Sequence, residues 1–295
     1  MPKQLIVTAD DFGLALPVNE AVERGHREGI LTAASLMVTG AAVADAVERA
    51  RRLPCLGVGL HLVLVDGRPA LPPEQIPDLV GPEGRFLDDP FRLGIRIYRS
   101  RRAQAQIEGE IRAQLEAFRR TGLRLDHLDG HHHFHQHPTV QRILVRLARE
   151  FGIAAVRLPY EPFLASWRAM RDRGVRRLLT AAFHANRAAA MKRRLRRAGI
   201  RCNDAMLGLV DTGRMGPERV RRFLAALPEG VSELYFHPAT RRWGAVDAWP
   251  SDYEPEAEFA ALIDPGVRAA LEASGAGLAT FSDLAEGGLR RASAP

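Results

Sequence analysis

Residues 4–13 read QLIVTADDFG, a short apolar run that ends in two adjacent carboxylates, Asp10 and Asp11. A continuous apolar run of this length is typical of a strand buried on both faces of a parallel sheet. In parallel α/β folds the catalytic and binding residues lie where the strands end. We therefore expect a strand over residues 4–8 and a functional role for the carboxylates that follow it.

Beyond this strand, apolar runs alternate with amphipathic stretches of helical period. Gly29 follows the first helical stretch, where a left-handed glycine often ends a helix. The β-α-β-α order predicts one parallel, barrel-like α/β domain over residues 1–295, with a long loop at 65–91 and a helical basic insertion at about 161–200. Further strands are expected at 33–38, 56–64, 125–134, 153–158, 232–236 and 278–281, and helices at 17–28, 42–52, 102–121, 138–151, 217–226 and 266–273.

The composition is that of a folded, water-soluble protein. Of the 295 residues, 46% are hydrophobic and 26% are charged, which excludes wholesale disorder. The sequence shows no signal-peptide pattern and no apolar run long enough to span a bilayer, and Cys55 and Cys202 form no Cys-x-x-Cys pair. We therefore expect a cytoplasmic protein without a disulfide framework or a thiolate metal site.

The net charge of +7 is unevenly distributed along the chain. Residues 92–102 and 168–201 are basic and partly amphipathic, so they could contact the inner face of an anionic membrane or form a solvated helix surface. Only 6% of the residues are aromatic and no nucleic-acid-binding motif is present. We therefore expect no nucleic acid partner, while a homodimer is left open.

Polar residues lie at the ends of four expected strands. Asp10 and Asp11 follow the first, His61 lies near the end of the third, and His237 follows a later one, while residues 127–137 contain six of the ten histidines. Each feature alone has an ordinary structural explanation, such as a helix cap or a hydrogen-bonded core histidine. Their occurrence at one edge of the sheet indicates a metal site.

Imidazole and carboxylate ligands suit zinc, manganese and related divalent metals, and two histidines with one aspartate leave room for water and substrate. One carboxylate of the adjacent pair can bind the metal and the other can accept a proton, because neighbouring strand residues point to different sides. If the histidine-rich segment stays extended, His127, Asp129 and His131 share one face, and Asp129 could orient a ligand histidine. Arg157 could bind substrate oxygens, orient Asp10 or form a plain salt bridge.

In order and spacing, these motifs resemble the YdjC-like family of carbohydrate deacetylases. The resemblance implies a distorted TIM-like (β/α) barrel of the NodB-related deacetylase type, with one divalent metal ion (Mg, Zn or Mn). The matching motifs are TADDFG at 8–13, GLHL at 59–62, HLDGHHHFH at 127–135 and FHP at 236–238.

The resemblance also implies roles for individual residues. Asp11, His61 and His131 become the metal ligands. Asp10 becomes the candidate general base and His237 the candidate general acid or oxyanion stabiliser. Beside these residues, the place of four others in or near the expected strand ends makes them candidates for binding substrate or supporting the ligands: Asp129, His127, His133 and Arg157.

A narrower resemblance, to the hopanoid-biosynthesis branch of this family, covers residues 19–23, 31–40, 59–73 and 233–240. It implies removal of the acetyl group from an N-acetylglucosaminyl unit carried on a hopanoid lipid. Ala239 follows the His-Pro pair where many relatives that act on sugar oligomers carry glycine. If the substrate is linked to a lipid, the basic surface could hold the protein at an anionic membrane.

Three other functions remain open from the sequence. The first is deacetylation of soluble chito-oligosaccharides. The second is a metal-dependent phosphoesterase, although such sites usually hold several metals and more carboxylates. The third, a peripheral membrane-binding scaffold built on residues 168–201, leaves the polar residues at four strand ends unexplained.

Overall fold

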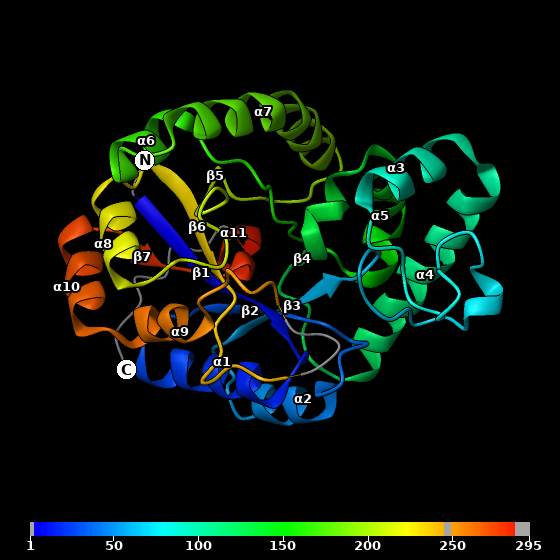
Figure 1. The fold of residues 1–295 in the computed structure, drawn as a ribbon, viewed down its shortest axis with the longest axis horizontal. Coiled ribbons are helices and arrows are strands. Elements are labelled where there is room, and N and C mark those ends of the chain that lie inside the picture. Colours follow the sequence, from blue (N-terminus) through cyan, green and yellow to red (C-terminus); the bar gives the residue numbers. More distant parts are fainter. Residues whose placement is uncertain (1–2, 245–248, 287–295) are drawn as a thin grey trace.

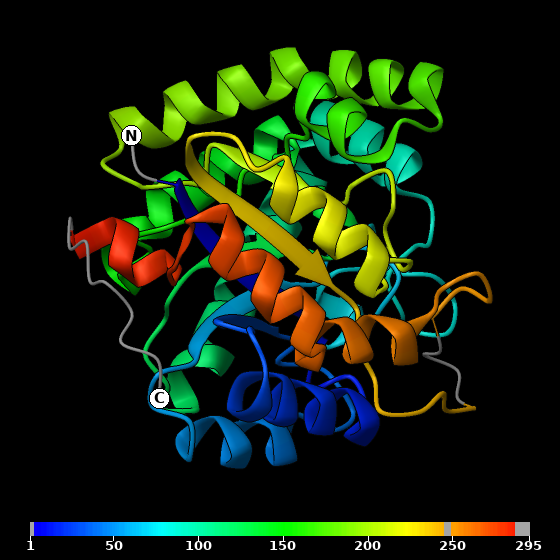
Figure 2. The ribbon, with the colours of Figure 1, turned by 90° about the vertical axis from the view of Figure 1, so that its left-hand side faces the viewer.

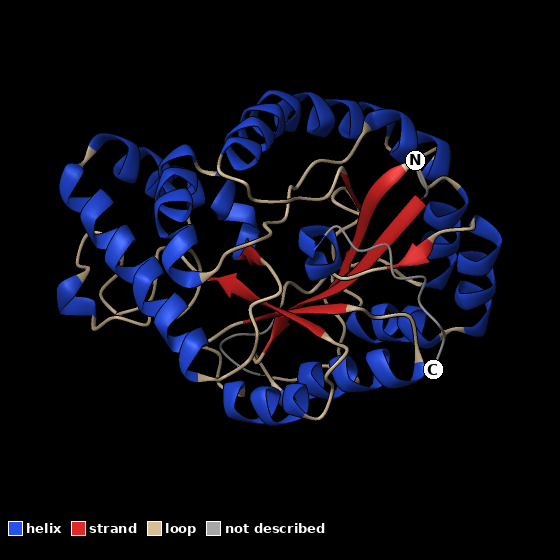
Figure 3. Ribbon diagram, turned by 180° about the vertical axis from the view of Figure 1, so that it is seen from behind, coloured by secondary structure: helices blue, strands red, loops and turns tan. Residues whose placement is uncertain are grey.

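The computed structural model describes residues 3–244 and 249–286. Within them, seven strands form one parallel sheet in the order β4-β3-β2-β1-β6-β5, with β7 beside the start of β1. The sheet curls through the centre of the molecule and helices surround it (Figures 1 and 3). The predicted α/β class is confirmed. The strands are β1 (Lys3–Phe12), β2 (Ala33–Leu36), β3 (Gly57–Leu62), β4 (Leu128–Gly130), β5 (Ala205–Leu207), β6 (Gly230–Phe236) and β7 (Gly277–Leu278).

The helices follow the strands in the predicted alternation. Figure 2 shows α8 and α10 in front of β6, and α6 and α7 occupy most of residues 161–200 along the upper side of Figure 1. The α-helices are α1 (Leu16–Glu28), α2 (Val43–Arg51), α3 (Pro90–Arg99), α4 (Arg101–Arg120), α5 (Pro138–Phe151), α6 (Phe163–Met170), α7 (Gly174–Arg197), α8 (Pro217–Ala225), α9 (Pro255–Ile263), α10 (Pro265–Ser274) and α11 (Phe281–Glu286), and the 3₁₀ helices are η1 (Pro73–Gln75) and η2 (His131–Gln136).

Strand β1 is the central strand and continues beyond the expected end at residue 8. It pairs with β6 along residues 3–9 and with β2 from Thr8 to Phe12. Every residue from Leu5 to Phe12 is buried. Two buried neighbours therefore fix the position of the carboxylates at its end.

The sheet does not close into a complete barrel. Between the edge strands β4 and β5, residues 153–158 make only single bridges, Leu128 to Val156 and Ala155 to Arg201. The strand expected there is therefore an extended segment, although the backbone N–H of Arg157 still donates to the carbonyl of Leu128 at 3.0 Å. This segment carries Arg157 across the opening between the two edges.

Of the strand expected over residues 125–134, only Leu128–Gly130 forms a strand. β4 ends at Gly130, and η2 follows with His132 and His133 at φ values of 52° and 54°. Left-handed backbone at two consecutive residues cannot continue a pleated strand. The histidine-rich segment therefore coils, and His127 and His131 do not share one strand face.

Gly29 ends α1 for a reason other than the expected left-handed cap. Its φ is −128°, which is not a left-handed value. A Cβ on Gly29 would lie 2.1 Å from the carbonyl oxygen of Leu262, at the end of α9. The glycine is needed because the backbone of α9 passes directly over it.

Replacing Gly29 with alanine should destabilise the protein by about 1–3 kcal/mol, because backbone atoms must move to admit the methyl group. Urea unfolding measures the change. Gly277→Ala is the matched control, since nothing lies within 4 Å of a Cβ at that glycine. Equal unfolding free energies for the two variants would contradict the close approach.

Candidate functional site

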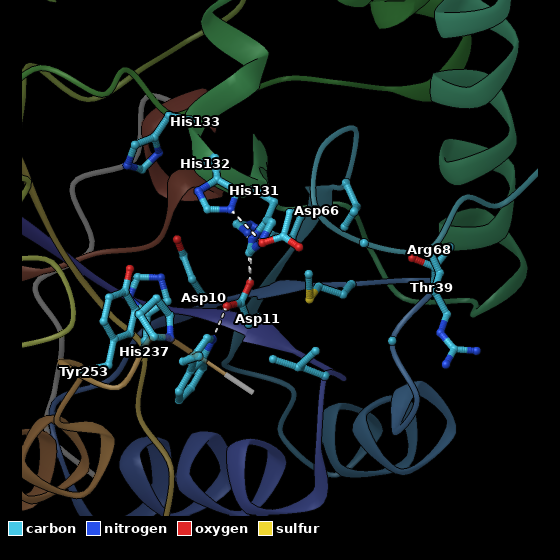
Figure 4. A pocket seen from close by; sticks show the side chains of 18 of the residues that line it. Asp10, Asp11, Thr39, Asp66, Arg68, His131, His132, His133, His237 and Tyr253 are labelled. Atoms are coloured by element: carbon cyan, nitrogen blue, oxygen red, sulfur yellow. Dashed lines mark hydrogen bonds and ion pairs between the residues drawn. The ribbon is translucent and has the colours of Figure 1, made fainter. Parts of the chain in front are cut away.

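A pocket opens where β1, β3 and β6 end, and Figure 4 shows side chains from separate segments pointing into it. Its polar lining comes from the end of β1, from the loop after β3, from η2 and from the loop after β6. The polar lining residues include Asp10, Asp11, His61, Asp66, Arg68, His131, His132, His133, Tyr235, His237 and Tyr253.

The three expected metal ligands meet in this pocket. Oδ1 of Asp11 lies 3.2 Å from Nε2 of His61 and 3.1 Å from Nδ1 of His131. Asp11 and His61 are buried, and His131 is half-buried at the pocket side. Their ligand atoms lie within 4.8 Å of one another, so one cation can contact all three.

A local irregularity of β1 turns Asp11 into the site. Asp11 has a φ of 60°, and the register with β2 shifts between Ala9 and Phe12. In a regular strand Asp10 and Asp11 would point to opposite faces. The left-handed residue breaks this alternation, so both carboxylates line one pocket.

Two further contacts hold this turn. The backbone N–H of Gly13 donates to Oδ1 of Asn19 at 2.8 Å, which ties the turn to α1. Nε1 of Trp249 donates to Oδ2 of Asp11 at 2.7 Å. Oδ2 is therefore committed to the indole, while Oδ1 faces the two histidines.

Asp129 orients His61 from behind. Nδ1 of His61 donates to Oδ1 of Asp129 at 2.9 Å, so a cation that displaces the second ring proton would find the lone pair at Nε2. The hydroxyl of Ser35 donates to Oδ2 of Asp129 at 2.8 Å. Burial alone would lower the pKa of His61, but the carboxylates of Asp129, Asp10 and Asp11 raise that pKa well above its usual value.

The chemistry of these donors fits a metal ion. When the ring of His61 is neutral and its Nδ1 donates to Asp129, the lone pair of Nε2 faces the carboxylate oxygen Oδ1 of Asp11 at 3.2 Å. Two electron-pair donors at such a distance repel unless a proton or a cation lies between them. Burial tends to raise the pKa of Asp11, but His131 and His61 hold it well below its usual range. One carboxylate and two imidazoles form a donor set suited to a divalent metal.

Arg157 lies among three carboxylates behind the pocket. Its guanidinium donates to both oxygens of Asp10, at 2.8 and 2.7 Å, and its Nε donates to Oε1 of Glu233 at 2.9 Å. It also pairs with Oδ2 of Asp129 at 2.5 Å. Arg157 is fully buried and absent from the pocket lining, and its two hydrogen bonds hold the carboxylate of Asp10 in place.

His237 follows β6 and lines the pocket. Its backbone N–H donates to the carboxylate of Glu258, and its buried Nδ1 has no hydrogen-bond partner. Burial lowers the pKa of His237, although the carboxylates of Asp11 and Asp10 act in the opposite direction. Burial also raises the pKa of Glu258 to about 7.

The remaining histidines of the cluster separate from one another. His132 is exposed and pairs with Asp66 at 3.4 Å, and His133 lines the pocket with its ring centroid 5.4 Å from that of Tyr235. His127 does not line the pocket. Its Nε2 lies 3.1 Å from Oγ of Ser35, so it reaches the site only through the hydroxyl that supports Asp129.

Several residues of the site were not singled out in the sequence. Glu233 is a carboxylate inside an apolar strand, and this pattern could have marked it as the partner of a buried cation. Ser35 lies unremarkably in the run AASL. Glu258 and Trp249 come from segments outside the recognised motifs, and nothing in their local sequence indicates the contact with His237 or Asp11.

His135 gives a pH-dependent stability that can be measured. Its Nε2 donates to the carbonyl of Arg157 at 3.0 Å, and its buried Nδ1 has no partner. Burial lowers the pKa of His135 to about 4, below the value of about 6.5 in an unfolded chain. The unfolded state therefore binds more protons between these values, and stability falls as the pH falls from 6.5 to 4.

When the pH falls from 6.5 to 4, the unfolding free energy of His135→Gln should fall less than that of wild type. The difference should be on the order of 2–3 kcal/mol. The measurement is the unfolding free energy of chelator-treated protein at pH 6.5 and at pH 4, compared with wild type. His132→Gln, at an exposed histidine, should keep the wild-type pH dependence. Identical slopes for His135→Gln and wild type would contradict the buried neutral state of His135.

Comparison with known proteins agrees with the arrangement of the motifs. Residues 4–273 match the model of the YdjC-like protein family. A carbohydrate deacetylase of Brevibacillus brevis is 43% identical over 157 residues, which are 53% of this chain and 60% of that protein. The match thus spans less than two thirds of this bacterial relative. A human carbohydrate deacetylase is 33% identical over 300 residues, covering 95% of this chain and 91% of the human protein.

A solved structure shares the fold. An Enterococcus faecalis protein, provisionally described as a cellobiose-phosphate cleavage protein, superposes with a TM-score of 0.71 at 25% identity. The superposition covers 96% of this chain and 99% of that one. Together with the family match over residues 4–273, these similarities show that the chain belongs to the YdjC-like family.

Proposed function

We propose that this protein is a metal-dependent hydrolase that removes the acetyl group from an N-acetylated sugar. The observation that carries the proposal is the meeting of Asp11, His61 and His131 at one point of an open pocket. The relatives named carbohydrate deacetylase support the same chemistry. Asp10 and His237 line the same pocket and supply the acid–base groups that amide hydrolysis needs.

Asp11, His61 and His131 hold the cation in this proposal. A divalent metal supplies a Lewis acid that polarises the amide carbonyl and makes water more acidic. Imidazole nitrogens suit zinc and manganese better than magnesium. A set of one carboxylate and two imidazoles is nevertheless compatible with each of the three metals. Asp129 and Ser35 keep the ring of His61 in the tautomer that presents Nε2 to the site.

Asp10 accepts the proton of the attacking water. Arg157 donates to both of its oxygens, but each carboxylate oxygen retains a second lone pair. The arginine therefore fixes the direction in which Asp10 takes the proton. Water adds to the carbonyl carbon, the C–N bond breaks, and the products are acetate and the free sugar amine.

His237 protonates the departing amine. Burial lowers the pKa of His237 and so disfavours the protonated form. The carboxylates of Asp11 and Asp10 favour that form. The backbone hydrogen bond to Glu258 fixes where the ring lies.

The substrate in this proposal is an N-acetylglucosaminyl group linked to a hopanoid lipid. The motifs at residues 59–73 and 233–240, which resemble the hopanoid-associated branch, support this choice. Soluble chito-oligosaccharides are the second candidate, because the relatives are named only for a carbohydrate substrate. With the hopanoid-linked substrate, the protein would work at the inner face of the cytoplasmic membrane.

Variants at the two adjacent aspartates should separate metal binding from proton transfer. Asp11→Asn should lose both the bound metal and acetate release, because Asn lacks the anionic ligand. Asp10→Asn should keep the metal and lose about 10²–10⁴-fold in turnover, the usual contribution of a general base. Calorimetric titration with Zn²⁺ or Mn²⁺ and an acetate assay measure the two effects.

Asp88→Asn is the control for the aspartate variants, since Asp88 is exposed and does not line the pocket. It should retain metal binding and activity. Loss of metal from Asp10→Asn, with Asp11→Asn still loaded, would reverse the proposed assignment. The melting temperature of each variant shows that it is folded.

Acetate release from two substrates should identify the substrate class. The wild-type protein is expected to deacetylate an N-acetylglucosaminyl lipid in a metal-dependent manner, and chelation or His131→Ala should abolish the release. Release from an N-acetylglucosamine oligomer alone would assign the protein to soluble sugars. If folded, metal-loaded protein releases acetate from neither, the deacetylase proposal is wrong, and phosphate-ester hydrolysis becomes the assay.

A further inference from the structure

Two helices outside the site expose apolar residues to solvent. On α3, Phe91 is 73%, Ile95 61% and Tyr98 67% exposed, while Leu93 and Ile97 on the opposite face are buried. The three exposed residues recur at helical spacing and form a continuous stripe. The helix is thus apolar on the face that no other described element covers.

The first half of α7 repeats this pattern. Val175 is 75%, Leu179 63% and Phe183 52% exposed, at intervals of four residues, with Leu178 beside them. The helix already buries a different face through Ala181, Ala188, Met191 and Leu195. Its second apolar stripe therefore adds nothing to the core of the chain.

Both helices contact the histidine-rich segment that follows β4. Gly94 of α3 would place a Cβ 3.6 Å from the ring of His137, and Nδ1 of His184 of α7 lies 3.3 Å from Oε1 of Gln136. Gln136 belongs to η2, the short helix that also carries His131. In Figure 1, α7 lies along the top of the molecule and α3 to its right, around this segment.

All formal charges on these two helices are positive. Neither α3 nor α7 contains an aspartate or glutamate, whereas Arg92 and Arg99 flank the first stripe and Arg176 and Arg187 the second. These four arginines are exposed. Within the described residues, no helix is both long enough and apolar enough to cross a bilayer. A surface of this kind fits contact with a membrane interface.

We propose that the exposed stripes of α3 and α7 are a docking surface for an anionic lipid bilayer. The apolar side chains enter the interface between head groups and acyl chains, while the arginines meet the lipid phosphates. A second copy of this chain fits the surface less well, because a two-fold contact would bring arginines of both copies together without a carboxylate from either helix.

The consequence for catalysis rests on the proposed function. Docking through α3 and α7 would hold η2 and its pocket histidines near the membrane surface, where a lipid-linked sugar is displayed. The docking itself requires no deacetylation. A binding measurement with vesicles that carry no sugar therefore tests the surface whether or not the deacetylase proposal is right.

The experiment is co-sedimentation of the full chain with vesicles of phosphatidylglycerol and phosphatidylcholine, and with vesicles of phosphatidylcholine alone. Wild type should bind the anionic vesicles and lose binding as salt rises, because exposed charges are screened. Val175→Ser with Leu179→Ser should lower the partition coefficient about tenfold or more, since two large apolar side chains no longer enter the interface.

The matched control is Leu16→Ser, which removes a leucine that is 54% exposed on α1, at the side of Figure 1 opposite α7. It should bind as wild type does. An independent pair on α3, Phe91→Ser with Tyr98→Ser, should weaken binding as the α7 pair does, with the melting temperature of each variant unchanged.

Three results would each overturn the docking surface. The first is no binding of wild type to anionic vesicles at low salt. The second is equal binding by wild type and both double variants. The third is a wild-type dimer in light scattering that the Val175→Ser, Leu179→Ser variant dissociates, because a second copy would then cover the face.

Discussion

The buried guanidinium of Arg157 organises the sheet of this molecule. Arg157 contacts carboxylates from β1, β4 and β6, namely Asp10, Asp129 and Glu233. Because a buried ionic group is costly when a partner is missing, these strands can pack only in the arrangement that brings the carboxylates together. The segment that carries Arg157 also bridges the opening between the sheet edges. The ion pairs of Arg157 thus hold the strands together and also fix the positions of Asp10 and Asp129 beside the pocket.

One departure from regular strand geometry brings two adjacent carboxylates into the same pocket. A pleated strand offers only alternate side chains to a face, yet Asp10 and Asp11 both serve this pocket because Asp11 is left-handed. Such backbone at a residue other than glycine costs free energy, and the contacts of Asn19 and Trp249 hold it in place. Two carboxylates can then differ in role although they are neighbours in the chain.

The sequence predicted those features that depend on local pattern. The apolar run of β1, the period of α5 and the positions of Asp11, His61 and His131 at strand ends all follow from spacing, and the structure brings these three residues together. The coil at His132 was not predictable, because histidine carries little preference between strand and turn. Ser35, Glu258 and Trp249 were missed because their partners are distant in sequence.

The central place of β1 has a consequence for the order of events during synthesis. β1 is made first, yet its longest partner, β6, begins at Gly230, more than two hundred residues later. Pairing across such a separation is slow and comes late in folding. The apolar segment from Leu5 to Phe12 must therefore wait, unpaired on that edge, until most of the chain has left the ribosome. During that interval its unpaired edge and apolar side chains are open to association with other chains, which a chaperone would prevent.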